Sequence, residues 1–348
     1  MAETTERPAG PGAGLLPRLR SRARSLFPGL LIAATVAMAA RFLSLHHGAP
    51  VMLLALLLGM AFNFLTEEAE GRCVAGIEFA SRTLLRLGVA LLGLGITVQQ
   101  IAALGSGVVA LTVAGVAGTI AMSLLLSRLV GRRARFALLT GGAVAICGAS
   151  AALAISSVLP QGPTKERDTV FTVIGVTALS TVAMVAYPLV AAGLGLNDLQ
   201  AGIFLGATIH DVAQVVGAGY SISQEAGDTA TVVKLMRVAL LVPVVVGLSL
   251  VFASRRDGAG RTPLPIPFFV LGFCALVALG STGLVPEAAR QTVLEASRWC
   301  LVIAIAALGM KTSLKKLKDV GRSAVVVICG LTVALAVGVL AVIEAGLV

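Results

Sequence analysis

The chain has 348 residues, of which 57% are hydrophobic and only 13% charged, and its formal net charge is +10. Soluble chains carry about 25% charged residues, so this composition excludes a disordered chain, a coiled coil and an ordinary soluble enzyme. Apolar stretches of near-membrane length recur from end to end and predict an all-α polytopic protein embedded in a lipid bilayer. The basic residues lie in short loops between these stretches, so we expect them to orient the protein in the membrane and expect no nucleic-acid partner.

The first segment, residues 1–25, is polar and rich in arginine, and we expect a basic cytoplasmic N-terminal tail. An apolar run from Leu26 to Ala40 follows it. A basic flank before an apolar run is also typical of a cleavable signal peptide, and Ala37-Met38-Ala39 fits a cleavage site. Because further apolar runs follow, we favour a retained first transmembrane helix.

Residues 26–348 form a single predicted transmembrane domain with about eleven spanning helices. Eleven crossings from a cytoplasmic N-terminus place the main basic loops inside, in a multi-pass protein of the cytoplasmic (inner) membrane with its C-terminus outside. The expected spans lie near residues 26–40, 51–65, 74–98, 108–130, 136–159, 170–194, 201–220, 232–253, 267–279, 291–310 and 324–342, and the main basic loops near 132–135, 255–261 and 311–322.

An internal repeat is suggested by two similar segments. Ala80-Ser81-Arg82 and the following Leu92-Gly93 recur as Ala296-Ser297-Arg298 and Leu308-Gly309, at a constant offset. In an eleven-span chain the two copies run in opposite directions, and inverted repeats are typical of secondary transporters. We therefore predict repeat halves of about 26–135 and 232–348, linked by core helices within 136–222. Chance similarity between helices rich in Leu, Ala and Gly is the alternative.

The predicted span at 136–159 contains a glycine-rich interruption. Gly141, Gly142 and Gly148 weaken a helix, each by about 1 kcal/mol relative to Ala. A broken helix exposes an N-terminus with free N–H groups, which binds anions without a formal charge. Cys147 and Ser150 could line the same spot, so all five residues are candidate substrate contacts. The alternative is an unbroken, close-packing helix face.

The predicted span at 201–220 carries a second polar interruption. His210 and Asp211 are ionisable groups deep within an apolar run, and Gln214 falls on the same helix face as Asp211. Ionisable groups at membrane depth are costly and mark pathways or proton relays. Histidine titrates near neutral pH, so it can exchange a proton during transport. We predict these three residues to contact substrate; a buried packing histidine is the alternative for His210.

Several basic residues also lie within or beside predicted spans. Arg82 follows Glu78 and Arg298 follows Glu295 at helical spacing, so structural ion pairs and substrate contacts both remain open for these cations, as for Arg86 and Arg237. No acid pairs with Lys234 at helical spacing, which makes it the best candidate for a mobile partner of an anion.

The sequence contains none of the common nucleotide-binding, metalloprotease or paired-cysteine motifs. No phosphate-binding loop and no HExxH motif occurs, and the five cysteines form no CxxC pair, so we expect no ATP engine, metal or cofactor and no disulfide framework.

Three runs resemble the bacterial YeiH family, described as sulfate exporters, over nearly the whole chain from about residue 27. The runs are Leu92–Ile96, Thr140–Ala152 and Ile209–Val215. The resemblance implies an inner-membrane carrier that exports a small oxyanion such as sulfate. The pattern is also similar to bile-acid-symporter and arsenite-carrier folds, with inverted repeats and discontinuous helices. One departure concerns the two interruptions, which do not map onto each other at the offset of the Arg82 and Arg298 segments.

We expect, from these features together, a secondary active transporter, not an enzyme, that carries a small inorganic or organic anion under an ion or proton gradient and can form homo-oligomers. A cation/proton antiporter that uses Asp211 is the alternative within transport. A channel and a membrane-embedded enzyme with His210 and Asp211 as acid and base are further alternatives.

Overall fold

The computed structural model describes residues 15–67, 72–160, 162–252, 268–312 and 322–348, which form helices and contain no strand. Six helices within these ranges are long and apolar enough to cross a membrane. They are α1 (Leu15–His47, apolar from Ala23), α7 (Gly105–Leu129), α10 (Lys165–Gly193), the continuous pair α13 (Gln224–Ala239) and α14 (Leu241–Val251), α16 (Glu287–Lys311) and α17 (Arg322–Glu344).

Shorter elements fill the space between the long helices. Four consecutive pieces, α4 to η2, follow one another without a gap and together reach membrane length. The shorter elements are α2 (Val51–Ala61), α3 (Phe64–Glu67), α4 (Val74–Phe79), η1 (Ala80–Leu84), α5 (Leu85–Leu92), η2 (Gly93–Gly95), α6 (Val98–Ala103), α8 (Ala134–Ala145), α9 (Ala149–Val158), α11 (Asp198–Thr208), α12 (Val212–Ile222) and α15 (Phe268–Ser281).

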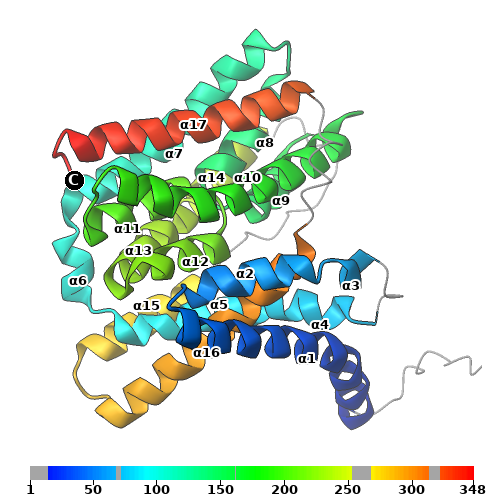
Figure 1. The fold of residues 1–348 in the computed structure, drawn as a ribbon. Coiled ribbons are helices and arrows are strands. Elements are labelled where there is room, and N and C mark those ends of the chain that lie inside the picture. Colours follow the sequence, from blue (N-terminus) through cyan, green and yellow to red (C-terminus); the bar gives the residue numbers. More distant parts are fainter. Residues whose placement is uncertain (1–14, 68–71, 161, 253–267, 313–321) are drawn as a thin grey trace, which may run out of the picture.

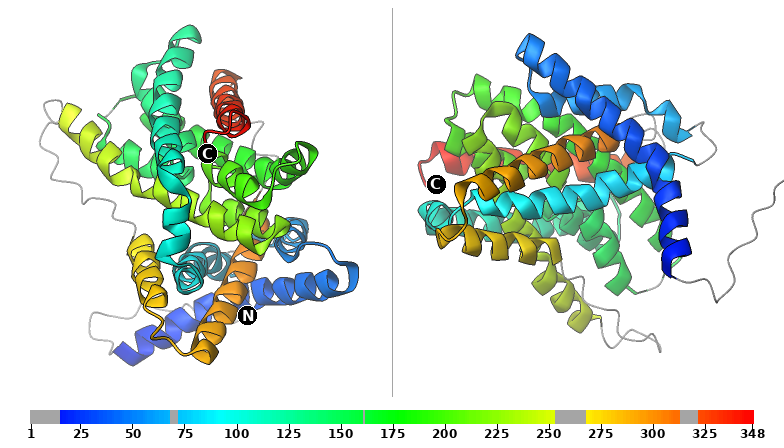
Figure 2. Two further views of the ribbon diagram at one scale, coloured as in Figure 1. Left: turned by 90° about the vertical axis from the view of Figure 1, so that its left-hand side faces the viewer. Right: turned by 90° about the horizontal axis from the view of Figure 1, so that it is seen from below.

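The helices gather into two bundles (Figures 1 and 2). The hairpin bundle consists of α7 to α14 together with α17, and the second bundle of α1 to η2 together with α15 and α16. Helix α6 joins them along one side. Helix α12 packs against α2 and α16, and so carries much of the contact between the bundles. There Gly217 of α12 lies beside Ile305 of α16 and Met184 of α10.

Helix contacts within the second bundle depend on glycine. A methyl group at Gly59 of α2 would meet the Ala306 carbonyl and lie 3.1 Å from the Cα atom of Gly309, both on α16. Gly29 of α1 and Gly76 of α4 form a similar close pair. Small residues let helix backbones approach where lipid supplies no hydrophobic driving force between helices.

Helices α8 and α9 form a hairpin that turns back on itself. A methyl group built on Gly142 would touch the side chain of Ile155. In a straight continuation these residues would be about 20 Å apart, at about 1.5 Å per residue. Phe136 at the start of α8 and Leu159 just after α9 line one cavity, so both legs of this first hairpin open on the same side.

Helices α11 and α12 form a second hairpin of the same kind. Methyl groups built on Gly202 of α11 and Gly219 of α12 would lie 2.9 Å and 3.1 Å from one carbonyl oxygen, that of Ala226 in α13. A straight helix would separate the two glycines by about 25 Å. In the chain, α10 begins just after the open end of the first hairpin and ends just before the open end of the second. The open ends of the two hairpins therefore lie at opposite ends of α10.

The hairpins correct the expectation that residues 136–159 and 201–220 each cross the membrane once. Each leg has only 10 to 12 residues, whereas a crossing needs about 20. The combined apolar run has the length of one span, which is why sequence alone predicts a crossing. The expected total of about eleven crossings is therefore not confirmed.

The ion pairs expected at Arg82 and Arg298 are present. Arg82 Nη1 lies 2.9 Å from Glu78 Oε1, and Arg298 Nη1 lies 3.8 Å from Glu295 Oε1. Arg86 instead stacks its guanidinium over the ring of Phe269. These three cations lie within the second bundle, on η1, α5 and α16.

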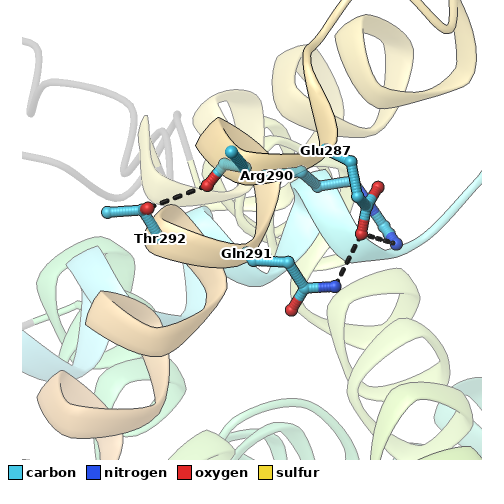
Figure 3. A network of polar contacts seen from close by, with 5 residues as sticks. Glu287, Arg290, Gln291 and Thr292 are labelled. Carbon is cyan, nitrogen blue, oxygen red and sulfur yellow. Dashed lines mark hydrogen bonds and ion pairs between the residues drawn. The ribbon is translucent and has the colours of Figure 1, made fainter.

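The first turn of α16 carries an exposed polar network (Figure 3). Arg290 Nε and Gln291 Nε2 donate to the carboxylate of Glu287 at 2.9 Å and 2.6 Å, while Thr292 Oγ1 donates to the Ala288 carbonyl. A carboxylate at a helix N-terminus is favoured by the helix dipole.

Parts of the expected topology fall outside the described residues. They include residues 1–14 of the basic tail, the loop at 255–261 and residues 313–321 of the last basic loop.

Candidate functional site at the hairpin tips

The first hairpin turns at Ile146-Cys147-Gly148. Helix α8 ends at Ala145, and Gly148 then adopts φ +61° and ψ −124° immediately before α9. Only glycine enters this region without strain. The predicted break therefore exists, and it falls at Gly148 rather than at Gly141 or Gly142, which are helical and buried.

The second hairpin turns at Ile209-His210-Asp211. Asp211 has extended backbone angles and is the N-cap of α12, since its Oδ1 atom accepts the N–H of Ala213 at 2.8 Å. Its own N–H donates to Ser180 Oγ of α10 at 3.0 Å. Asp211, a partly exposed residue, thus both ends the turn and places its carboxylate at the start of α12.

The two tips meet. A methyl group built on Gly148 would lie 3.7 Å from both the Cβ atom and the carbonyl oxygen of His210. Four helix ends therefore converge: the C-termini of α8 and α11 and the N-termini of α9 and α12. Helix C-termini carry partial negative charge and N-termini partial positive charge.

Two buried cations on α13 hold the C-terminal ends. Lys234 Nζ donates to the carbonyls of Ile146 at 2.6 Å and Ile209 at 2.9 Å, so it bonds both tips at once. Lys234 is fully buried and Arg237 is 2% exposed. Cations at helix C-termini satisfy carbonyls that have no partner within the helix.

Arg237 spreads its guanidinium across the same two helix ends. Its Nε and Nη2 atoms donate to Ala145 and Val144 of α8 at 2.7 Å and 2.8 Å. Its Nη1 atom donates to Gly206 and Ile209 of the second hairpin at 3.1 Å and 3.2 Å. The planar guanidinium can donate several hydrogen bonds in different directions. Here it bonds carbonyls of both hairpins, which fixes the two tips relative to each other.

His210 is fully buried and reaches α17. Its Nε2 atom lies 2.9 Å from Thr332 Oγ1, and that hydroxyl donates to the Ile328 carbonyl at 2.8 Å. A hydroxyl has a single hydrogen, so Thr332 accepts from His210, and the neutral imidazole carries its hydrogen on Nε2. The Nδ1 atom has no hydrogen-bond partner among the described residues.

Gln214 is also fully buried, one turn into α12. Its Nε2 atom donates to Thr181 Oγ1 of α10 at 2.8 Å, while its Oε1 atom has no partner within the described part of the chain. Buried polar atoms normally have partners. An acceptor without one points to a bound water, ion or ligand.

Comparison with known proteins identifies the family. Residues 28–328 match the family described as "Conserved hypothetical protein 698". A membrane protein of Chlorobaculum tepidum named UPF0324 is 58% identical over 90% of this chain and 88% of its own length. The chain belongs to the UPF0324 family of membrane proteins. A UPF0324 protein of Paracoccus denitrificans named TauZ is 56% identical over 91% of this chain and 95% of its own length, and one of Rhizobium meliloti is 55% identical over 90% and 91%.

No solved structure matches this UPF0324 chain. The relatives' names describe membrane proteins and state no substrate. The sulfate-exporter description implied by the YeiH resemblance, and the bile-acid-symporter likeness, therefore remain expectations.

The UPF0324 structure brings four of the predicted site residues together: Gly148, His210 and Lys234 meet at the tips, with Cys147 buried in the first turn. Asp211 and Gln214 follow on α12. Lys234 is held by two carbonyls rather than free to move with an anion.

The remaining predicted residues of the UPF0324 site lie beside the tips. Gly141 packs against Ser123 of α7 and Gly142 against Ile155 of α9, so both support the hairpin. Ser150 is exposed on α9.

Some residues at the UPF0324 tips were not among the predicted contacts. Arg237 stood out in the sequence only as one of several cations, although its spacing of three from Lys234 within an apolar run was the signal for a shared role. Thr332, Ser180 and Thr181 gave no signal, because isolated hydroxyl residues are common in membrane helices. Among the described residues no group of three His, Cys, Asp or Glu could hold a metal ion.

Proposed function

We propose that this protein is a secondary active transporter that carries a small oxyanion such as sulfate across the cytoplasmic membrane. The observation that carries the proposal is the meeting of the two hairpin tips, where, within the described part of the chain, three helix ends bond charged side chains and the fourth does not. Lys234 and Arg237 bond the ends of α8 and α11, and Asp211 caps α12. The N-terminus of α9 begins at Gly148, which has no side chain.

The charge balance at the tips favours an anion. The formal side-chain charges there are two positive, on Lys234 and Arg237, and one negative, on Asp211. The two helix N-termini and two C-termini that meet there carry opposite partial charges, so the excess positive charge of the side chains sets the sign. A singly or doubly charged oxyanion would accept the N–H groups at the start of α9, as anions do at other helix N-termini. The apolar surroundings strengthen this attraction, because burial lowers the local dielectric.

Repeat architecture supports alternating access. Helix α7 ends at Leu129 and α10 at Gly193, and α8 begins at Ala134 and α11 at Asp198, so each pair of boundaries is 64 residues apart. Each unit is one long helix followed by one hairpin. Because α7 and α10 run in opposite directions, we infer an inverted pair around the site, with the substrate between the repeats.

The offset between the Arg82 and Arg298 segments fits a second inverted repeat. Helix α7 ends at Leu129 and α17 at Glu344, and α2 begins at Val51 and α15 at Phe268. These boundaries lie within a residue or two of the spacing that separates Arg82 from Arg298. We propose that the hairpin bundle moves against the second bundle through the contacts of α12, with the N-terminus inside and the C-terminus outside.

Thermal unfolding of the purified protein tests the anion site. Potassium sulfate is compared with potassium chloride at equal ionic strength for wild type, Gly148→Leu and Asp211→Asn. A ligand that binds only the folded state raises the unfolding temperature. We expect the sulfate shift in wild type, its loss in Gly148→Leu and its retention or increase in Asp211→Asn, since the latter removes a negative charge. Equal shifts in all three proteins would contradict the proposal.

Flux measurements then separate a carrier from a pore. In proteoliposomes loaded with sulfate, a carrier shows saturable uptake of labelled sulfate and counterflow, whereas a channel shows neither. An ion or proton gradient imposed across the vesicles identifies the driving force, since no ATP-binding motif is present.

A cation/proton antiporter is the second candidate, and one observation favours it. Gln214 Oε1 is a buried acceptor without a partner among the described residues, on the helix that Asp211 caps, and oxygen ligands of this kind suit a hard cation. This candidate predicts sodium- or lithium-dependent proton flux in vesicles that Asp211→Asn abolishes and that is indifferent to sulfate.

A further inference from the structure

Only one of the two ring nitrogens of His210 has a hydrogen-bond partner among the described residues. Its Nε2 hydrogen bonds Thr332, whose own hydrogen is committed to the Ile328 carbonyl. This chain of two bonds fixes the ring and leaves the lone pair of Nδ1 without a donor among the described residues. The lone pair of Nδ1 is therefore the position on the ring that can take up a proton.

The position of this ring couples it to the proposed anion site. The Cβ atom of His210 lies 3.7 Å from a methyl group built on Gly148, at the N-terminus of α9. A positive imidazolium would therefore stand beside a bound anion. The ring and the helix N-terminus come from different hairpins, so both contribute only while the tips are together.

The charged groups around His210 oppose its protonation when no anion is present. Lys234 and Arg237 of α13 face it as buried cations. Asp211 follows it in the chain, and Lys311 of the second bundle acts on Asp211. The first hairpin brings Gly148 against it, next to the Cys147 thiol in the chain, and α17 brings the uncharged Thr332. A third buried cation is costly unless a negative charge arrives with it.

We propose that His210 takes up one proton with each oxyanion that binds at the N-terminus of α9, so that anion and proton are carried together. The inference rests on the proposed function and adds the identity of the coupling group. The proton comes from water, adds to the Nδ1 lone pair, and leaves from the same atom when the anion leaves. Thr332 is the positioning residue that keeps Nδ1 as the vacant nitrogen.

Proton uptake on binding is the direct test. Potassium sulfate is added to the purified protein in weakly buffered detergent solution containing a pH indicator, with potassium chloride as the blank. We expect the solution to become more alkaline, by up to one proton per bound sulfate. By linkage, the affinity for sulfate should fall about tenfold per pH unit over the range in which His210 is neutral when free and protonated when bound.

Two substitutions assign the proton. His210→Asn should abolish the uptake and leave a weaker sulfate shift that no longer depends on pH. His46→Asn is the matched control, because His46 is exposed on α1 and bonds only its own helix; it should behave as wild type. Thr332→Val should keep an uptake but move the pH at which it is half complete, since Nε2 then loses its acceptor.

The outcomes separate the two proposals. Sulfate binding in wild type without proton uptake between about pH 5 and pH 8, the range in which histidine titrates, would overturn the coupling and leave the anion carrier intact. Uptake that persists in folded His210→Asn protein would do the same. Absence of any sulfate response in wild type at every pH would overturn both.

Discussion

Gly148 and His210 belong to different helix hairpins, yet a methyl group on Gly148 would lie 3.7 Å from the Cβ atom of His210. This contact joins the two interruptions that the sequence places about sixty residues apart. Lys234 stabilises the contact, because its ammonium group bonds a carbonyl of each tip. Disturbing either tip should therefore affect both.

Gly148→Ala should destabilise the protein through its backbone. At φ +61° and ψ −124°, a sparsely populated region, an alanine costs about 1–3 kcal/mol, while its methyl group meets only ordinary van der Waals contacts. The unfolding temperature in detergent measures the effect. Gly118→Ala is the control: Gly118 lies within α7, and a methyl group there meets no atom within 4 Å, so alanine should be neutral or stabilising by about 1 kcal/mol. Equal stability of the two variants would contradict the strained tip.

Arg237→Met should be far more damaging than Arg82→Met. Removing the guanidinium takes this donor from the carbonyls of Val144, Ala145 and Gly206, while the Ile209 carbonyl keeps its bond from Lys234. Each buried acceptor left alone costs about 1–3 kcal/mol. We expect a loss of about 3 kcal/mol or more. The Arg82 side chain is 62% exposed in its ion pair, and such pairs contribute about 1 kcal/mol or less. Similar losses in the two variants, measured by unfolding in detergent, would show that the tips do not depend on Arg237.

Gly59→Ala tests the packing of α2 on α16. The added methyl group would meet the Ala306 carbonyl and the backbone of Gly309, so the helices must separate, at about 1–3 kcal/mol. Gly338→Ala in α17 has open space around it and should cost nothing. Unfolding temperatures of the two variants give the comparison, and an unperturbed Gly59→Ala protein would refute the close contact.

Cysteine labelling tests the hairpins. In a background with the native cysteines replaced, Arg133→Cys and Glu166→Cys flank the first hairpin, and Leu194→Cys and Glu225→Cys flank the second; all four positions are exposed. A membrane-impermeant maleimide should label the first two from one side of oriented vesicles and the last two from the other.

A straight crossing by α8 and α9 would give a different labelling pattern. It would place Arg133→Cys and Glu166→Cys on opposite sides, and that result would exclude the hairpin. Labelling of all four after the vesicles are permeabilised is the control for reactivity.

Much of the site could be predicted because ionisable side chains are costly inside a membrane and a glycine cluster weakens a helix. Gly148, His210 and Asp211 were found on this ground, and the backbone does break beside each of them. The role of Lys234 could not be foreseen. Sequence reasoning searches for an acid partner at helical spacing, whereas its partners are backbone carbonyls of Ile146 and Ile209, distant in the chain.

The sequence by itself determined an all-helical membrane chain with two interrupted segments, since hydropathy, glycine content and buried charge are local properties. Only the tertiary structure decided that each segment turns back and that the two tips touch. A run of two short apolar legs has the same composition whether it is extended or folded. What selects the folded form is contact with distant helices: Ala226 of α13 between the legs of one hairpin, and Arg237 across the carbonyl ends of both.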